Sequence, residues 1–166
     1  MARLFARFLD SLITALLTAV AGWHWMGPVV DAMRPAFEDA AAGRSGEDVI
    51  TLLSQPEVQP ALERYGFVGL LVGMVYTVST VHLFGGTLGK LVLGLRVTEW
   101  EEPGNPSWGQ SLARWLTREP VQSLPVIGPF LGTAYWMLDS IWLLWDPRRQ
   151  CLHDKLPGTV VVRRRW

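Results

Sequence analysis

The amino-acid sequence predicts an all-α membrane protein, a helical bundle of three clear transmembrane helices plus a polar fourth or re-entrant helix, with a small cytoplasmic two-strand element. Composition is the first observation behind this prediction, because the 166 residues are 49% hydrophobic and 18% charged, with a mean hydropathy of +0.20. Three long apolar runs are the second. The third is charge segregation, which a formal net charge of zero conceals. We expect one membrane domain, residues 1–166, in contact with a lipid bilayer and not with nucleic acid.

Each apolar run predicts a membrane-spanning helix. The first, residues 4–26, would extend about 34 Å and so cover a bilayer core, although its end also resembles a signal-peptide cleavage site. The second, residues 67–84, contains no Asp, Glu, Lys or Arg. The third, residues 125–145, contains one acid, Asp139, and ends in tryptophans typical of an aromatic belt.

The segment between the first two runs, residues 27–64, is acidic, with seven acids and three bases. It lacks the positive excess of a cytoplasmic loop, so we expect it on the outer face. The apolar residues from Val29 to Ala42 have helical spacing, and Ser45 has the position of an N-cap. Two or three short amphipathic helices are predicted there.

The tail, residues 146–166, has six bases and two acids and is therefore predicted to be cytoplasmic. With the N-terminus also cytoplasmic, residues 107–124 should form a fourth crossing or a re-entrant amphipathic helix. The alternative is that this segment lies on the cytoplasmic surface. Two β-branched runs, residues 95–100 and 159–164, look like short strands that pair with each other.

Three blocks of the chain carry recognisable motifs. Near the start of the first run, Arg7 and Asp10 lie three residues apart. Residues 85–97 (GGTLGKLVLGLRV) precede residues 106–116 (PSWGQSLARWL), and residues 146–162 read DPRRQCLHDKLPGTVVV. Together these blocks resemble the RDD family of small integral membrane proteins, and they cover most of the chain except its acidic segment.

The resemblance implies which charged residues matter. The Arg and two Asp of the family name fall on Arg7, Asp10 and Asp154, and Pro157 stands where a small residue is more usual. For function it implies little, because the family is tied only loosely to transport.

We expect Arg7, Asp10 and Asp154 to form an ionic cluster. His153 and Lys155 are candidates to join it. The cluster would either lock the tail against the bundle or line an ion path, since charges within membranes are usually functional. The alternative is an interfacial Arg7 that extends to the headgroups and an Asp10 that complements the helix dipole.

A second ionic contact is expected in the third apolar run. There Asp139 should meet Arg114 or Arg118, because a charge in lipid requires a partner. Its role would be packing or, as the sharper alternative, that of a protonatable carboxylate in a translocation path.

Cofactor and metal sites have weak sequence support. His24 and His82 are expected to form interfacial hydrogen bonds, and axial ligation of haem or chlorophyll magnesium by either is the alternative. The lone Cys151 and the lack of CxxC or Cys/His ligand spacing predict no metal site. We expect Lys90, in the glycine-rich segment GGTLGK, to pair with anionic headgroups. No catalytic motif is recognisable, so no enzyme activity is expected.

Two functions fit these features. The first is an accessory or scaffold subunit of a larger membrane complex. Nine tryptophans and a short, charge-poor bundle offer much surface for contacts with neighbouring membrane proteins, but little room for a channel within the chain itself. The second is a small ion- or proton-coupled transporter that uses the Arg/Asp/Asp cluster and Asp139. Both place the chain in the cytoplasmic membrane of a bacterium, with partner subunits or as a homo-oligomer.

Overall fold

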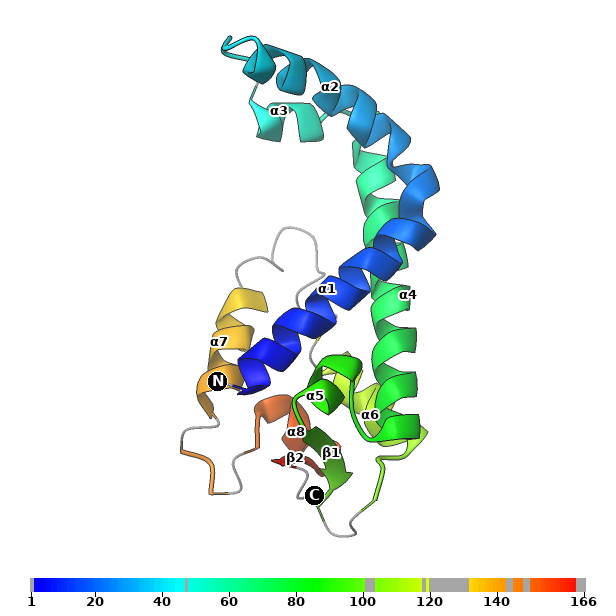
Figure 1. The fold of residues 1–166 in the computed structure, drawn as a ribbon, viewed down its shortest axis with the longest axis vertical. Helices are drawn as coiled ribbons and strands as arrows, with labels where there is room; N and C mark the ends of the chain where they lie inside the picture. The colour runs from blue at the N-terminus through cyan, green and yellow to red at the C-terminus, as the bar shows by residue number, and fades with distance from the viewer. Residues whose placement is uncertain are drawn as a thin grey trace. The chain divides into compact units, whose positions relative to one another are not determined.

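The computed structural model describes residues 2–46, 48–100, 104–117, 119, 132–142, 145–147 and 150–163. These residues are mostly helical, and they contain one two-stranded sheet (Figure 1). In chain order the elements are α1 (Ala2–Gly22), the 3-10 helix η1 (Trp23–Trp25), α2 (Gly27–Ala41), α3 (Val49–Leu53), α4 (Gln59–Phe84), α5 (Leu88–Val92), β1 (Leu95–Glu99), α6 (Trp108–Leu116), α7 (Thr133–Trp142), α8 (Leu152–Lys155) and β2 (Thr159–Arg163).

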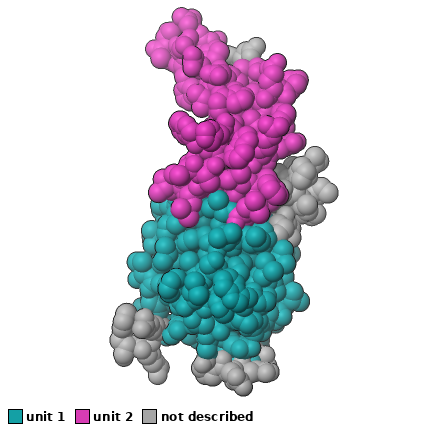
Figure 2. Space-filling model, turned by 90° about the vertical axis from the view of Figure 1, so that its right-hand side faces the viewer, with its two compact units in different colours: residues 1–14, 72–166 teal, residues 15–71 magenta. Residues whose placement is uncertain are grey.

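Two compact units divide the chain (Figure 2). Unit 1 combines residues 1–14 with residues 72–166, and unit 2 comprises residues 15–71. Unit 1 therefore joins the start of the chain to its end, and it contains all three motif blocks of the sequence.

Two of the described helices are long and apolar enough to cross a membrane, over Phe5–Trp25 and Gln59–Phe84. At 1.5 Å per residue they extend about 32 Å and about 39 Å, which covers a hydrocarbon core. The first matches the predicted run. The second begins eight residues before the predicted start at residue 67, because Pro60 is tolerated in the first turn of a helix.

The two other predicted crossings are not confirmed. Helix α6 has nine residues and α7 has ten, so each is about 15 Å long or less and neither would span a bilayer core alone. Residues 118, 120–131, 143 and 144, which complete both predicted segments, lie outside the described residues.

The predicted strand pair is confirmed in unit 1. Strands β1 and β2 are antiparallel, with Leu95 opposite Arg163 and Glu99 opposite Thr159. Glycines with positive φ precede both strands, Gly94 at 67° and Gly158 at 66°, a conformation that L side chains rarely adopt. The sheet packs with the ends of α1 and α4 around a small core of buried apolar side chains: Ala6, Val81, Leu95, Val97 and Val161.

Unit 2 has its own small core, formed by Val29, Val58 and Ala61. The predicted helix near Val29 is α2, and α3 follows it. The expected N-cap at Ser45 is wrong, because α3 begins at Val49 and Asp48 is its N-cap residue.

Candidate functional site

Four buried side chains of unit 1 form a continuous charge network: Arg114 of α6, Asp139 of α7, and His153 and Asp154 of α8. The Arg114 guanidinium makes an ion pair with Asp154 and also donates to Thr159 Oγ1 at 2.7 Å. His153 Nδ1 lies 2.7 Å from Asp139 Oδ2, and the His153 backbone N–H donates to Asp139 Oδ1 at 3.1 Å. The network links helices α6, α7 and α8 to strand β2.

Local helix signals place these side chains. Ser107 caps α6 by accepting from the Gln110 backbone N–H at 3.2 Å, and the Ser107 backbone N–H in turn donates to the Gln110 side-chain oxygen at 2.7 Å. The helix then buries Ser111, Arg114 and Trp115 on one face. In α8, Asp154 accepts from the Cys151 backbone N–H at 3.3 Å, which fixes its carboxylate at the helix N-terminus.

The hydrogen bonds of His153 define its tautomer. Nε2 lies 3.2 Å from an Arg114 amino group, which can only donate, so Nε2 accepts and Nδ1–H donates to Asp139. Burial lowers the pKa of His153, and Arg114 lowers it further. Asp154 and Asp139 raise this pKa, but the net change is downward. The imidazole is therefore neutral at pH 7.

Asp154, in contrast to the neutral His153, is held in its charged, deprotonated form. Burial alone would raise the pKa of this carboxyl, but Arg114, then His153 and Lys90, lower it below its usual value. Lys90 therefore acts electrostatically on Asp154 within the protein. The sequence had suggested anionic lipid headgroups as its partner.

The predicted pairings within this site need correction. Asp139 was expected to meet Arg114 or Arg118, but it binds His153, which stands between Asp139 and Arg114. Arg7 acts electrostatically on Asp139, and the ion pair of Asp154 is with Arg114. Arg118 lies outside the described residues.

Asp10 was expected in the same cluster, but it forms a separate clasp with Tyr76, Thr87 and Gly89. Its Oδ1 accepts from the Tyr76 hydroxyl and the Gly89 backbone N–H, each at 2.8 Å, and its Oδ2 accepts from the Thr87 hydroxyl at 2.5 Å. A side chain of α1 thereby caps the N-terminus of α5, whose own N-cap residue Thr87 makes no side-chain cap bond. We call this group the Asp10 clasp.

The clasp requires glycine at position 89. A Cβ there would lie 2.9 Å from Asp10 Cγ and would also collide with the Ala6 carbonyl oxygen. Two of the motif blocks recognised in the sequence, around Arg7 and around residues 85–97, therefore meet at this close approach.

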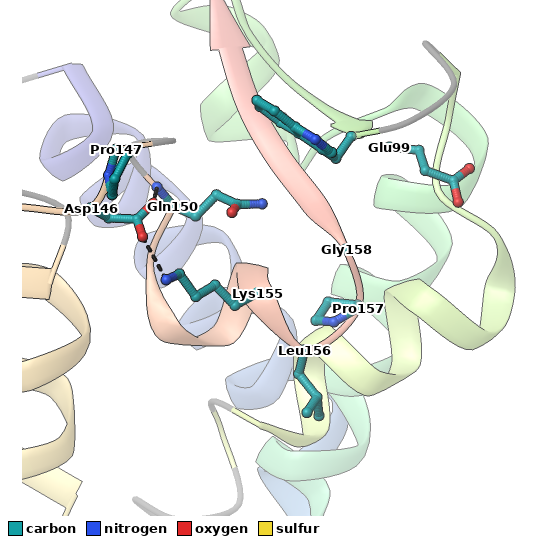
Figure 3. Close-up of a pocket in the computed structure, with 9 residues that line it drawn as sticks. Glu99, Asp146, Pro147, Gln150, Lys155, Leu156, Pro157 and Gly158 are labelled. Carbon is teal, nitrogen blue, oxygen red and sulfur yellow. Dashed lines mark hydrogen bonds and ion pairs between the residues drawn. The ribbon is translucent and has the colours of Figure 1, made fainter.

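Lys155 was also a candidate for the cluster, but it pairs with Asp146 at 2.5 Å (Figure 3). Its ammonium lies 5.4 Å from the centre of the Trp142 ring. The Lys155–Asp146 pair borders a pocket of about 640 Å³. Its lining residues are Glu99, Trp100, Asp146, Pro147, Gln150, Lys155, Leu156, Pro157 and Gly158. Polar groups in the lining already have partners, since Gln150 donates to the Thr159 carbonyl at 2.8 Å and Glu99 accepts from Gln110 at 2.5 Å.

The two histidines suggested as cofactor ligands have different surroundings. His82 Nδ1 donates to the Pro106 carbonyl at 2.9 Å, and its ring stacks on Trp108 at 4.3 Å. The expected hydrogen-bonding role therefore describes His82. His24 lies exposed on η1, and its ligand role stays a prediction.

The structure brings together one set of possible metal ligands that the residue spacing in the sequence did not reveal. Ligand atoms of Asp139, Cys151 and His153 lie within 4.8 Å of one another, and thiol, imidazole and carboxylate suit Zn²⁺. However, His153 Nδ1 carries the proton that it donates to Asp139, and the positive charges of Arg7 and Arg114 act on the same carboxylate and imidazole. Added divalent charge is disfavoured there, so hydrogen bonding accounts for Asp139 and His153 better than metal binding.

The lowered pKa values of the network predict loss of stability in acid. The unfolded imidazole takes a proton near pH 6.5 and folded His153 only at lower pH, so the unfolded state binds more protons within that interval. The melting temperature in detergent should therefore be level above pH 7 and decrease below about pH 6.5, with a further decrease near pH 4 from Asp154. The variant His153→Gln should lack the first decrease. A constant melting temperature from pH 7.5 to 5 would contradict the assignment.

Comparison with known proteins places this site in a family context. The model of the RDD family matches residues 1–158. The chain is 26% identical over 121 residues to an uncharacterized membrane protein, YteJ, of Bacillus subtilis (strain 168), which covers 69% of this chain. The chain spans 63% of the length of that relative. No solved structure matches.

Proposed function

Because this chain belongs to the RDD family and is a membrane protein, we propose that it acts as a non-catalytic accessory or scaffold subunit of a larger membrane complex. We further propose that it resides in the bacterial cytoplasmic membrane with both termini in the cytoplasm. The basic tail supports this orientation, because cytoplasmic segments carry an excess of Lys and Arg.

The uncovered apolar surface of the two long helices carries the proposal. Only 17% of the apolar window of each candidate span is buried within the chain. Large side chains project outward along both helices, with Phe8 62% exposed on α1 and Phe67 61% exposed on α4. Phe67, Leu71 and Val75 follow one another at intervals of four and so share one face of α4. Such a face suits lateral packing against another membrane helix.

The paired charges of unit 1 support the same role. Arg114 has buried acceptors in Asp154 and Thr159, and both oxygens of Asp10 accept hydrogen bonds. Groups bound in this way hold α1, α5, α6 and α8 in one arrangement. Such fixed contacts within unit 1 fit a scaffold.

One observation favours transport as the second candidate. His153 lies between two buried carboxylates, Asp139 and Asp154, and it is neutral but protonatable. A proton relay requires such a titratable group next to a membrane path. Both carboxylates are already bound, Asp154 in its ion pair with Arg114 and Asp139 in its hydrogen bond with His153, and this favours the structural role over transport.

Photocrosslinking from the exposed face of α4 tests the proposal. A photoreactive amino acid at Phe67, expressed in the native host, should give a discrete adduct with another membrane protein. The same group at Leu156, which is exposed but lies outside the spans, is the matched control and should not. No protein adduct at Phe67, combined with ion flux in reconstituted vesicles that the variant Asp154→Asn abolishes, would replace the scaffold with a transporter.

A further inference from the structure

We propose that the apolar face of α2 lies in the membrane–water interface and is covered by lipid. This face consists of Met26, Val29, Val30, Met33, Phe37 and Ala41. The proposal concerns unit 2 alone and requires neither a partner protein nor a transported ion.

The face is continuous and open. Its residues recur at intervals of three and four, so they form one stripe along the helix. They line a groove of about 510 Å³, with Arg34 and Glu38 at its rim. Two of its largest side chains project outward, since Phe37 is 68% exposed and Val30 is 52% exposed. An amphipathic helix of 15 residues with such a stripe requires an apolar environment on that side.

The core of unit 2 does not use these outward side chains. Val29 turns inward against Val58 and Ala61, and Met33 packs at the edge of that cluster. Val30 and Phe37 are not part of it. The remaining apolar surface of α2 is therefore free to contact something other than this unit's own core.

Position along the chain identifies lipid as the occupant. The candidate span Phe5–Trp25 ends at η1, whose Trp23 and Trp25 are typical of the membrane boundary. Met26 follows directly and belongs to the apolar stripe, and α2 begins at Gly27. The first turn of α2 must therefore lie at headgroup depth, directly after the span.

Charge on the other side of α2 fits this orientation. Asp31 and Asp39 lie away from the stripe and pair with Arg34 at 3.2 Å and Arg44 at 2.7 Å. Residues 27–64 hold seven acids and three bases, a net charge of −4. An acidic segment is repelled by anionic lipid, so the face suits zwitterionic lipid.

Spin labels on opposite faces of α2 test the proposal. Cys151→Ser removes the chain's one cysteine and keeps an N-cap side chain at that position. In this background, labels are attached at Phe37→Cys on the stripe and, as the matched control, at Asp31→Cys, whose side chain is 72% exposed. The full chain is reconstituted in phosphatidylcholine vesicles, and helical content is checked by circular dichroism. Collisions with lipid-soluble oxygen and with a water-soluble nickel complex are then measured.

The expected result is a ratio of oxygen to nickel collisions several-fold higher at position 37 than at position 31. Equal collision ratios at the two positions, with both labels accessible to nickel, would mean that the stripe faces water and would overturn the proposal. A label at position 37 that neither reagent reaches would mean that protein, such as a second copy of the chain, covers the stripe, and would overturn the proposal equally. Because the vesicles contain no other protein, failure here leaves the scaffold proposal untouched.

Discussion

Replacing Arg114 with methionine should destabilise the protein by about 3 to 5 kcal/mol, because it leaves buried Asp154 without its principal cation. Methionine retains much of the apolar stem of arginine, so lost packing contributes little. Thr159 Oγ1 and His153 Nε2 would also lose a donor. Unfolding by titration with a denaturing detergent, followed by tryptophan fluorescence, measures the loss.

Two variants keep this prediction specific to the network. Arg34→Met removes a surface ion pair whose partners are both largely exposed, so it should change stability little. The double variant Arg114→Met with Asp154→Asn should lose less than the sum of the two single variants, because it also removes the unpaired charge. Strict additivity would contradict the direct coupling of Arg114 and Asp154.

The elements that the sequence predicted well are those with local signals. A long apolar run without charged residues predicted the helix around residues 67–84. The two β-branched runs that follow glycines predicted β1 and β2. The last predicted span, residues 125–145, is not confirmed, because the structure describes a helix only over Thr133–Trp142 and residues 125–131, 143 and 144 lie outside the described residues. Apolar composition alone marks a candidate span and does not fix where its helix begins and ends.

The charged residues of the site were predicted better than their pairings. Asp10, Asp139 and Asp154 are all bound by buried or half-buried polar groups. Which groups bind them depends on how α1, α5 and α8 meet, and spacing along one helix carries no information about that. The donors that form the Asp10 clasp are a tyrosine, a threonine and a backbone N–H, which no charge pattern reveals.

Removing the Asp10 carboxylate is the second change with a large expected effect. Asp10→Ala would leave the Tyr76 hydroxyl, the Thr87 hydroxyl and the Gly89 N–H without their acceptor. An unsatisfied buried group costs about 1 to 3 kcal/mol, and the hydroxyls can turn toward other acceptors, so we expect a total of about 2 to 4 kcal/mol. The same detergent titration measures it, with Ser11→Ala, an exposed neighbour on α1, as the matched control.

Asp10→Asn separates the clasp from an ion path. The amide oxygen can still accept from Tyr76 and Gly89, and its NH₂ group can donate to the Thr87 hydroxyl, so most of the stability should be retained. A clasp needs acceptor atoms and not charge, whereas ion coupling needs a carboxylate that gains and loses a cation or proton. Stability and crosslinking close to those of the unaltered protein would therefore support the structural role. A stable Asp10→Asn variant that abolishes an ion flux present in the unaltered protein would assign Asp10 to transport.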